Sequence, residues 1–227
     1  MSEPLRILDL FCGLGGVARG FQKYLDERGI KYEYYAVDID KLVLILHKKL
    51  NPKSIIVCRD ALSYTIDELK QYDFIWASPE CRYYSRTNYF LKRFINDITL
   101  WYVIDILNKC GVPYVVENVK IPRERLVVKP SVVIDRHMFW SNLSLQKCSY
   151  KRRQKRFDYM SLDDWLEYHE ILGSIRKILY MLPYMKARKM LRNMLDSTLA
   201  YNLAKQVIPQ VLYYKRHKRL PTMFTFF

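Results

Sequence analysis

Cys81 is the residue of this sequence best placed to act as a nucleophile. It ends the tetrapeptide SPEC, residues 78–81, which directly follows an apolar run at residues 73–77. Most cysteines in folded proteins are inert packing residues, but a thiol that follows a strand and precedes the polar stretch RYYSRTN is placed to be exposed. Because Arg82 or Arg86 would favour the thiolate, which is the reactive form, we expect Cys81 to carry chemistry.

A carboxyl group follows another apolar run in the same way. Glu117 comes directly after residues 113–116, and Asn118 follows it. If partial burial raises the pKa of Glu117, this side chain becomes a proton donor at neutral pH. A helix cap or an ion pair is the alternative interpretation. Together, Cys81 and Glu117 offer a nucleophile and a general acid.

The segment FCGLGG, residues 11–16, lets the backbone approach a ligand closely and opens a helix. A tight structural turn is the alternative interpretation of these glycines alone. Acidic residues at the ends of the next two strands favour a ligand. Asp38 suits a pair of ribose hydroxyls, and Asp60 can accept a hydrogen bond from an adenine amino group. With Ile39 packing on the purine face, we expect an adenosine-type cofactor.

An alternation of strands and helices must position these residues. Apolar runs predict strands, and helical patterns between them predict helices. The predicted strands are residues 6–10, 34–37, 54–58, 73–77 and 113–116, and the predicted helices are residues 17–29, 41–50 and 92–110. This order predicts an α/β fold with a Rossmann-like, doubly wound, mostly parallel sheet. Ligands bind beyond the carboxyl ends of such strands, so these polar segments should converge at one edge.

The pattern changes after about residue 120. Residues 127–145 predict one or two further strands, residues 162–195 a helical region kinked at Pro183, and residues 200–214 a last amphipathic helix. The predicted division is a catalytic core at residues 1–142, a small, basic, mainly helical target-recognition region at 143–199, and a C-terminal helix returning to the core with a basic tail at 200–227.

Charge and cysteine usage restrict the partners. The 227 residues include 38 Lys and Arg against 23 Asp and Glu, a formal net charge of +15. The excess is concentrated after position 140, with 17 basic and 6 acidic residues, which predicts a polyanion partner. The five cysteines form no CxxC pair, so we expect no metal site and no disulfides. No apolar run is long enough for a bilayer span, and we expect a cytoplasmic monomer without a membrane partner.

Taken together, the motifs resemble the cytosine-5 DNA methyltransferase family. DLFCGLGG at residues 9–16 is similar to the family's first, cofactor-binding motif, and VDID at 37–40 and RDA at 59–61 are similar to its acidic second and third motifs. SPEC at 78–81 resembles the nucleophile loop, and ENV at 117–119 reproduces a further motif. The motifs occur in the family's order and cover roughly residues 6–120.

The resemblance implies that a compact member of this family transfers a methyl group from S-adenosylmethionine to carbon 5 of cytosine in double-stranded DNA. Cys81 would attack carbon 6, Glu117 would protonate ring nitrogen 3, and the target base would be flipped out of the duplex. The implied catalytic residues are Cys81, Glu117, Asn118 and Arg136. The implied cofactor-binding residues are Asp9, Phe11, Cys12, Gly13, Gly15, Gly16, Asp38, Ile39, Asp60, Ala61, Pro79 and Asn202. The implied nucleic-acid-binding residues are Arg82, Ser85, Arg86, Arg152, Arg153, Lys155 and Arg156.

The sequence departs from the family pattern at three places. Glu80 stands where the family has a proline, and its carboxylate should raise the pKa of Cys81 unless a cation compensates it. Arg136-His137-Met138 lacks the second arginine of an Arg-x-Arg motif, and no glycine precedes Asn202. Two other functions fit the same residues. The small recognition region permits the same reaction on RNA, and the departures permit a catalytically inactive DNA-binding module.

Overall fold

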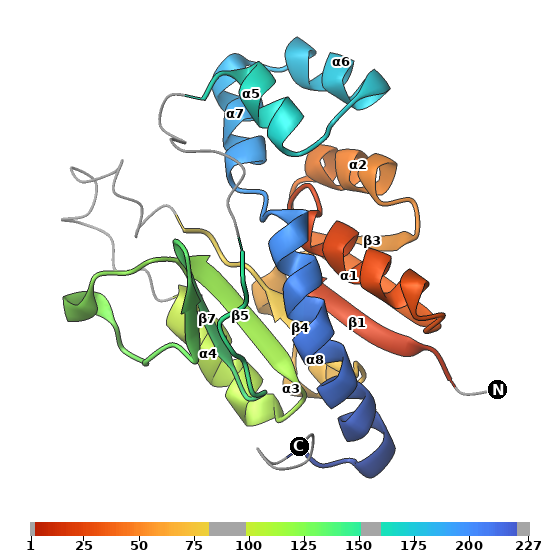
Figure 1. Ribbon diagram of the computed structural model, residues 1–227, viewed down its shortest axis with the longest axis vertical. Coiled ribbons are helices and arrows are strands. Elements are labelled where there is room, and N and C mark those ends of the chain that lie inside the picture. The colour runs from red at the N-terminus through yellow and green to blue at the C-terminus, as the bar shows by residue number, and fades with distance from the viewer. Residues whose placement is uncertain (1–2, 82–98, 151–159, 222–227) are drawn as a thin grey trace.

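The computed structural model describes residues 3–81, 99–150 and 160–221, and the structural statements below concern those residues. Within them, seven strands form one sheet in the order β3-β2-β1-β4-β5-β7-β6 (Figure 1). The first five strands are parallel, whereas β7 runs antiparallel to both β5 and β6. The predicted Rossmann-like, mostly parallel sheet is therefore confirmed. The strands are β1 (Leu5–Leu10), β2 (Tyr32–Asp38), β3 (Ser54–Cys58), β4 (Phe74–Ala77), β5 (Tyr114–Val119), β6 (Val132–Ile134) and β7 (His137–Ser141).

Helices cover both faces of the sheet (Figure 1). One face carries α1 (Gly16–Glu27), α2 (Lys41–Leu50) and α8 (Ser197–His217), and the other carries α3 (Ile66–Leu69) and α4 (Thr99–Cys110). Among the described residues, no helix is long and apolar enough to cross a membrane.

Side chains of each strand alternate between two hydrophobic clusters. Ile7 and Trp76 belong to the cluster that contains α1 and α8, whereas Leu8 and Ile75 belong to the cluster that contains α4. Because the central strands are buried on both faces, they read in the sequence as continuous apolar runs.

Two glycines of α1 allow α8 to pack directly against it. A Cβ atom at Gly16 would lie 1.9 Å from the backbone oxygen of Leu195, and one at Gly20 would lie 2.5 Å from the backbone nitrogen of Tyr201. Both distances are shorter than real Cβ contacts, so only glycine fits these positions. This packing holds the start of α8, and the segment before it, beside the glycine-rich turn.

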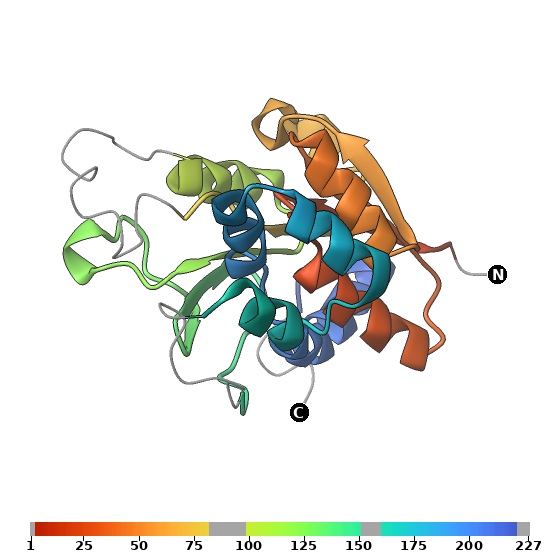
Figure 2. The same cartoon turned by 90° about the horizontal axis from the view of Figure 1, so that it is seen from above.

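Three further helices form a cap, which we define as residues 160–192. The cap helices are α5 (Leu162–Tyr168), α6 (Gly173–Met181) and α7 (Tyr184–Arg192). They share a hydrophobic cluster with Leu14 of the glycine-rich turn and Leu46 of α2, so the cap packs on the core of the fold. Seen from above in Figure 2, α6 lies in front of α1 and α2.

The chain breaks between the cap helices instead of kinking at Pro183, so that prediction is wrong. Pro183 stands at the N-cap of α7, and Leu182 before it is extended, because a proline disfavours the helical conformation of the preceding residue. Glu170, between α5 and α6, and Gly173, the first residue of α6, both have positive φ and interrupt the helical path there. The predicted division of the chain at residues 142 and 199 stays a prediction.

β5 is longer than the sequence predicts. It continues through Glu117 and Asn118 to Val119, because β7 pairs with it along this stretch and places Phe139 opposite Glu117. The ENV motif is therefore part of a strand and does not follow one. The predicted helix at residues 92–110 is observed from Thr99, and residues 92–98 lie outside the described part of the chain.

Candidate active site

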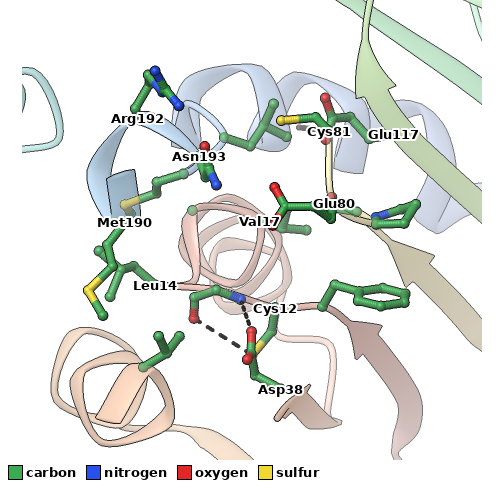
Figure 3. A pocket seen from close by; sticks show the side chains of 18 of the residues that line it. Cys12, Leu14, Val17, Asp38, Glu80, Cys81, Glu117, Met190, Arg192 and Asn193 are labelled. Atoms are coloured by element: carbon green, nitrogen blue, oxygen red, sulfur yellow. Dashed lines mark hydrogen bonds between the residues drawn. The ribbon is translucent and has the colours of Figure 1, made fainter. Parts of the chain in front are cut away.

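A cavity of about 480 Å³ lies at the carboxyl ends of β1, β2 and β4, beneath α7 and the segment that leads into α8 (Figure 3). This volume is typical of small-ligand sites. The sequence-predicted site residues that line it are Asp9, Phe11, Cys12, Gly13, Gly16, Asp38, Ile39, Pro79, Cys81, Glu117 and Arg136. The structure thus brings the predicted cofactor turn and the predicted catalytic pair to one pocket.

Asp38 fastens the glycine-rich turn to the end of β2. Its Oδ2 atom accepts a hydrogen bond from the backbone N–H of Gly13 at 3.1 Å, and its Oδ1 atom accepts one from the backbone N–H of Asp40 at 3.0 Å. An ionised carboxylate has about four acceptor positions, so two remain for ribose hydroxyls. Beside it, Ile39 exposes 71% of its surface at the pocket and is free to pack on a purine ring.

Gly15 supports the turn without lining the pocket. It has a φ of +86°, and a Cβ atom there would lie 2.2 Å from Nδ2 of Asn51 and 2.7 Å from His47. His47 contacts the turn through its Nδ1 atom, which lies 3.0 Å from the backbone oxygen of Gly13. Burial lowers the pKa of His47 to about 4, so its ring is neutral at physiological pH. The close approach of α2 therefore requires glycine at position 15.

Asp9 is a buried carboxyl group on the pocket wall. Its Oδ2 atom accepts a hydrogen bond from the Tyr34 hydroxyl at 2.9 Å, and its Oδ1 atom has no partner among the described residues. Burial raises the pKa of Asp9 to about 8. A buried acceptor without a partner is costly unless a ligand supplies one. Together with the ribose-binding capacity of Asp38, it fits a cationic cofactor that carries an adenosine group.

Besides Gly15, three predicted cofactor residues do not line the pocket. Asp60 caps a short 3-10 helix, Ala61–Ser63, by accepting a hydrogen bond from the backbone N–H of Leu62, and Ala61 is part of that helix. Asn202 lies within α8. α8 does return to the site, but the residues that line the pocket come from the segment just before it: Asn193, Met194 and Leu195.

Cys81 and Glu117 lie side by side at one end of the pocket (Figure 3). Burial raises the pKa of the Cys81 thiol to about 11, and the carboxylates of Glu117 and Glu80 act in the same direction. Arg192 at the end of α7 lowers this pKa. At neutral pH the thiol is therefore protonated.

The cap compensates the carboxylate of Glu80. The Nζ atom of Lys189 on α7 lies 3.4 Å from Oε2 of Glu80, and both side chains line the pocket. Lys186, one turn earlier, lies 3.8 Å from Oδ2 of Asp40, which follows β2. α7 thus forms ion pairs both with the segment that carries Cys81 and with the segment that follows β2.

Asn118 holds the segment that carries Cys81. Its Nδ2 atom donates a hydrogen bond to the backbone oxygen of Pro79 at 3.1 Å, and its Oδ1 atom accepts one from the backbone N–H of Val119. The side chain is buried and does not line the pocket. Asn118, which the resemblance implies to be catalytic, thus fastens the segment that carries Cys81 from outside the pocket.

Glu117 is hydrogen-bonded to a histidine on the neighbouring strand. Its Oε1 atom lies 2.6 Å from Nδ1 of His137, and Nε of Arg136 donates to Nε2 of the same ring at 3.3 Å. The side chains of Glu117 and His137 are 11% and 12% exposed, so the pair is largely shielded from water. Arg136 comes from the tight turn between β6 and β7, where Asp135 has a positive φ.

Sequence reasoning missed several pocket residues. His137 lies inside the incomplete Arg-x-Arg motif, but at the position where the motif allows any residue. For the residues of α7, the sequence showed only the spacing of a helix and no sign of a role in the pocket. The missed residues include His137, Lys186, Lys189, Arg192 and Asn193.

The predicted nucleic-acid contacts lie outside the described residues. They are Arg82, Ser85, Arg86, Arg152, Arg153, Lys155 and Arg156. Within the ranges given above, no group of three or more His, Cys, Asp or Glu is arranged to hold a metal ion.

Comparison with known proteins shows the class of protein to which this site belongs. Residues 5–122, slightly more than half of the chain, match the family of C-5 cytosine-specific DNA methylases. The chain belongs to this family, and its cofactor is S-adenosylmethionine.

Solved structures share the fold across nearly the whole chain. A DNMT2 mutant from Spodoptera frugiperda is 13% identical, with a TM-score of 0.54 over 90% of this chain and 99% of that chain. The methyltransferase EhMeth from Entamoeba histolytica is 11% identical, with a TM-score of 0.56 over 92% of this chain and 99% of that one. At such low identity the likeness concerns the fold alone. A search of curated protein sequences found no match.

Proposed function

We propose that this protein methylates carbon 5 of cytosine in DNA, with Cys81 as the nucleophile and Glu117 as the general acid. The observation that carries the proposal is the position of Cys81 and Glu117 side by side in the pocket that also contains the glycine-rich turn (Figure 3). S-adenosylmethionine supplies an electrophilic methyl group when it is bound. Asp9, Asp38 and Ile39 are the residues that would hold it.

Cys81 activates the pyrimidine ring. Its thiolate adds to carbon 6 of cytosine, forming an S–C bond, while Glu117 gives a proton to ring nitrogen 3. Carbon 5 thereby becomes nucleophilic and accepts the methyl group. Water then takes the carbon 5 proton, the S–C bond breaks and returns Cys81 as a thiolate, and nitrogen 3 gives its proton back to Glu117, which restores the ring.

The protonated resting thiol restricts when this chemistry can begin. Because the pKa of Cys81 is raised to about 11, a thiolate forms only when the pocket becomes more favourable to negative charge. Arg192, which already lowers this pKa, lines the same pocket as Cys81. The positive charge of a bound sulfonium would act in the same direction.

Double-stranded DNA is the proposed substrate. The reacting atoms of cytosine are not accessible in a stacked duplex, so the target base must flip into the pocket, at a cost of a few kcal/mol. Phosphate contacts from the basic second half of the chain would hold the duplex meanwhile. We expect the protein to act as a monomer in the cytoplasm, where it meets DNA.

The same reaction on RNA is the second candidate. The observation that favours it is the small size of the cap, three short helices that contribute α7 to the cofactor pocket. Such a cap leaves little surface for reading a duplex groove, whereas a single-stranded loop base needs less.

A transfer assay with tritiated S-adenosylmethionine separates these candidates. We expect label in duplex DNA, none in an RNA hairpin of the same sequence, and none with Cys81→Ser, which should still bind the cofactor. DNA that contains 5-fluorocytosine should form a covalent adduct with the wild-type protein, because fluorine at carbon 5 blocks release of the enzyme. Label only in RNA would replace the DNA substrate by RNA, and absence of any adduct would favour an inactive binding module.

A further inference from the structure

Glu117, His137 and Arg136 form a chain of hydrogen bonds in the wall of the pocket, beside Cys81. β5 and β7 are antiparallel, with His137 opposite Val119 and Phe139 opposite Glu117. Glu117 and His137 are therefore diagonal neighbours on one face of the sheet, which places long side chains within reach of each other. The observed separation of 2.6 Å is that of a short hydrogen bond.

The contacts of the imidazole ring determine its tautomer. Nε of Arg136 is always a donor, so Nε2 of His137, 3.3 Å away, must be an acceptor without a hydrogen. The ring proton is then on Nδ1, from which it is donated to Oε1 of Glu117. An imidazolium would present a second N–H to the arginine, so the bonding pattern requires a neutral ring.

The hydrogen bond from His137 occupies one oxygen of Glu117 and leaves the other for a ligand. Among the described residues, Oε2 of Glu117 has no hydrogen-bond partner, and the side chain lines the pocket beside Cys81. A carboxyl group held at one oxygen has a fixed orientation, and orientation of a catalytic group within a fraction of an ångström strongly affects rate.

We propose that His137 is a positioning residue, which uses its Nδ1–H to hold Glu117 with the free oxygen toward the base, and that Arg136 fixes the required tautomer of His137. This inference rests on the proposed function for the role of Glu117. It also assigns to Arg136 a task that needs no contact with the substrate.

Nitrogen NMR of the histidine side chains tests the tautomer independently of any activity. In the wild-type protein, the ring that disappears in His137→Asn should show the neutral form with the proton on Nδ1. In Arg136→Met, this preference should be lost, because Nε2 no longer faces a fixed donor. A wild-type ring protonated on Nε2 overturns the proposal even if the protein is an active methyltransferase.

Two matched variants test the positioning of Glu117. An asparagine amide nitrogen occupies the place of histidine Nδ1, so His137→Asn keeps a donor to Glu117, whereas His137→Gln places its amide near Nε2 and loses that donor. We expect kcat to fall about 100-fold in His137→Gln and His137→Leu and less than about tenfold in His137→Asn. The KM for S-adenosylmethionine should be unchanged in all three.

The outcomes separate this proposal from its premise. Equal kcat values for the asparagine and glutamine variants would show that the ring only fills space. Loss of cofactor binding in the same variants would show a general collapse of the pocket, which also overturns a positioning role. If the wild-type protein transfers no methyl group but the tautomer is as stated, the proposed function fails while the hydrogen-bond chain stands, and the positioning role is rejected with it.

Discussion

Lys189 of α7 lies 3.4 Å from Glu80, the residue directly before Cys81. The two residues are 109 positions apart in the sequence, so the cap compensates a charge that the nucleophile segment introduces. The family has a proline at position 80, where no compensation is needed. In this chain Glu80 takes the place of that proline, and Lys189 neutralises its charge.

Removing the compensating cation should slow the reaction of Cys81 with an alkylating reagent. In Lys189→Met, the carboxylate of Glu80 loses this cation and raises the pKa of the thiol further. The pair is partly exposed, so we expect at most about a fivefold lower rate of alkylation at pH 8. Peptide mass spectrometry of the Cys81 peptide measures this rate. Glu80→Gln/Lys189→Met should restore it, and a slow double variant would contradict the explanation.

The reactivity of Cys81 should increase with pH well beyond neutrality. Because burial raises the pKa of this thiol to about 11, its thiolate fraction grows about tenfold per pH unit up to that value. Iodoacetamide labelling of the cofactor-free protein between pH 7 and 10 should show this slope at Cys81. Cys58, which is exposed, serves as the internal control in the same digest. A plateau near pH 7 at Cys81 would refute the raised pKa.

Asp9 should make the cofactor-free protein less stable as the pH rises. Burial raises the pKa of Asp9 from 3.8 to about 8, so between these values the folded state holds a proton that the unfolded chain releases. The stability contributed by the protonated group is complete below pH 4 and is lost as the pH rises toward 8. Relative to wild type, Asp9→Asn should therefore gain Tm between pH 5 and 8.

The same variant tests the cofactor contact of Asp9. Its buried Oδ1 atom, which has no partner among the described residues, is the proposed partner of a cationic group. Asp9→Asn should weaken binding of S-adenosylmethionine about tenfold or more, as measured by calorimetry at pH 8. Asp26→Asn changes an exposed carboxyl of α1 and should leave both binding and the pH dependence as in wild type. Unchanged affinity in Asp9→Asn would remove this residue from the cofactor site.

Alanine at Gly16 or Gly20 should separate α8 from α1. A Cβ atom at either position meets backbone, which cannot move aside as a flexible side chain can. Overpacking of this kind costs about 1–3 kcal/mol, which urea unfolding would show as a lower midpoint. Gly29→Ala is the matched control, since it adds a Cβ atom in open space and loses only through its positive φ, about 1 kcal/mol. Equal losses at Gly16 and Gly29 would contradict the role of close packing.

The positions of the first five strands along the chain, and the residues at their ends, could be predicted because both are local properties. A run such as ILDL in β1 or FIWA in β4 is apolar because both faces of the sheet are covered, and the residue types change where the strand meets the pocket. For the same reason, residue type and position along the chain are enough to select Cys81 and Glu117. Their presence in one pocket follows from the parallel arrangement.

The end of β5 and the course of the cap could not be predicted in the same way. Glu117 and Asn118 remain in the strand because of pairing with β7, which is about twenty residues further along the chain. Pro183 separates two helices instead of kinking one, and nothing in the local pattern distinguishes these outcomes. Asn202 matched a motif weakly, whereas packing at Gly16 and Gly20 decides which residues of the returning segment reach the pocket.

By itself, the sequence determined the α/β architecture, the glycine-rich turn and the candidate reactive side chains, because periodicity and the residue types at strand ends are properties of neighbouring residues. Only the tertiary structure decided what surrounds each reactive group: His137 beside Glu117, Lys189 beside Glu80, and Arg192 near Cys81. Electrostatic interactions depend on distance in space, and these partners are 20 to more than 100 residues apart along the chain.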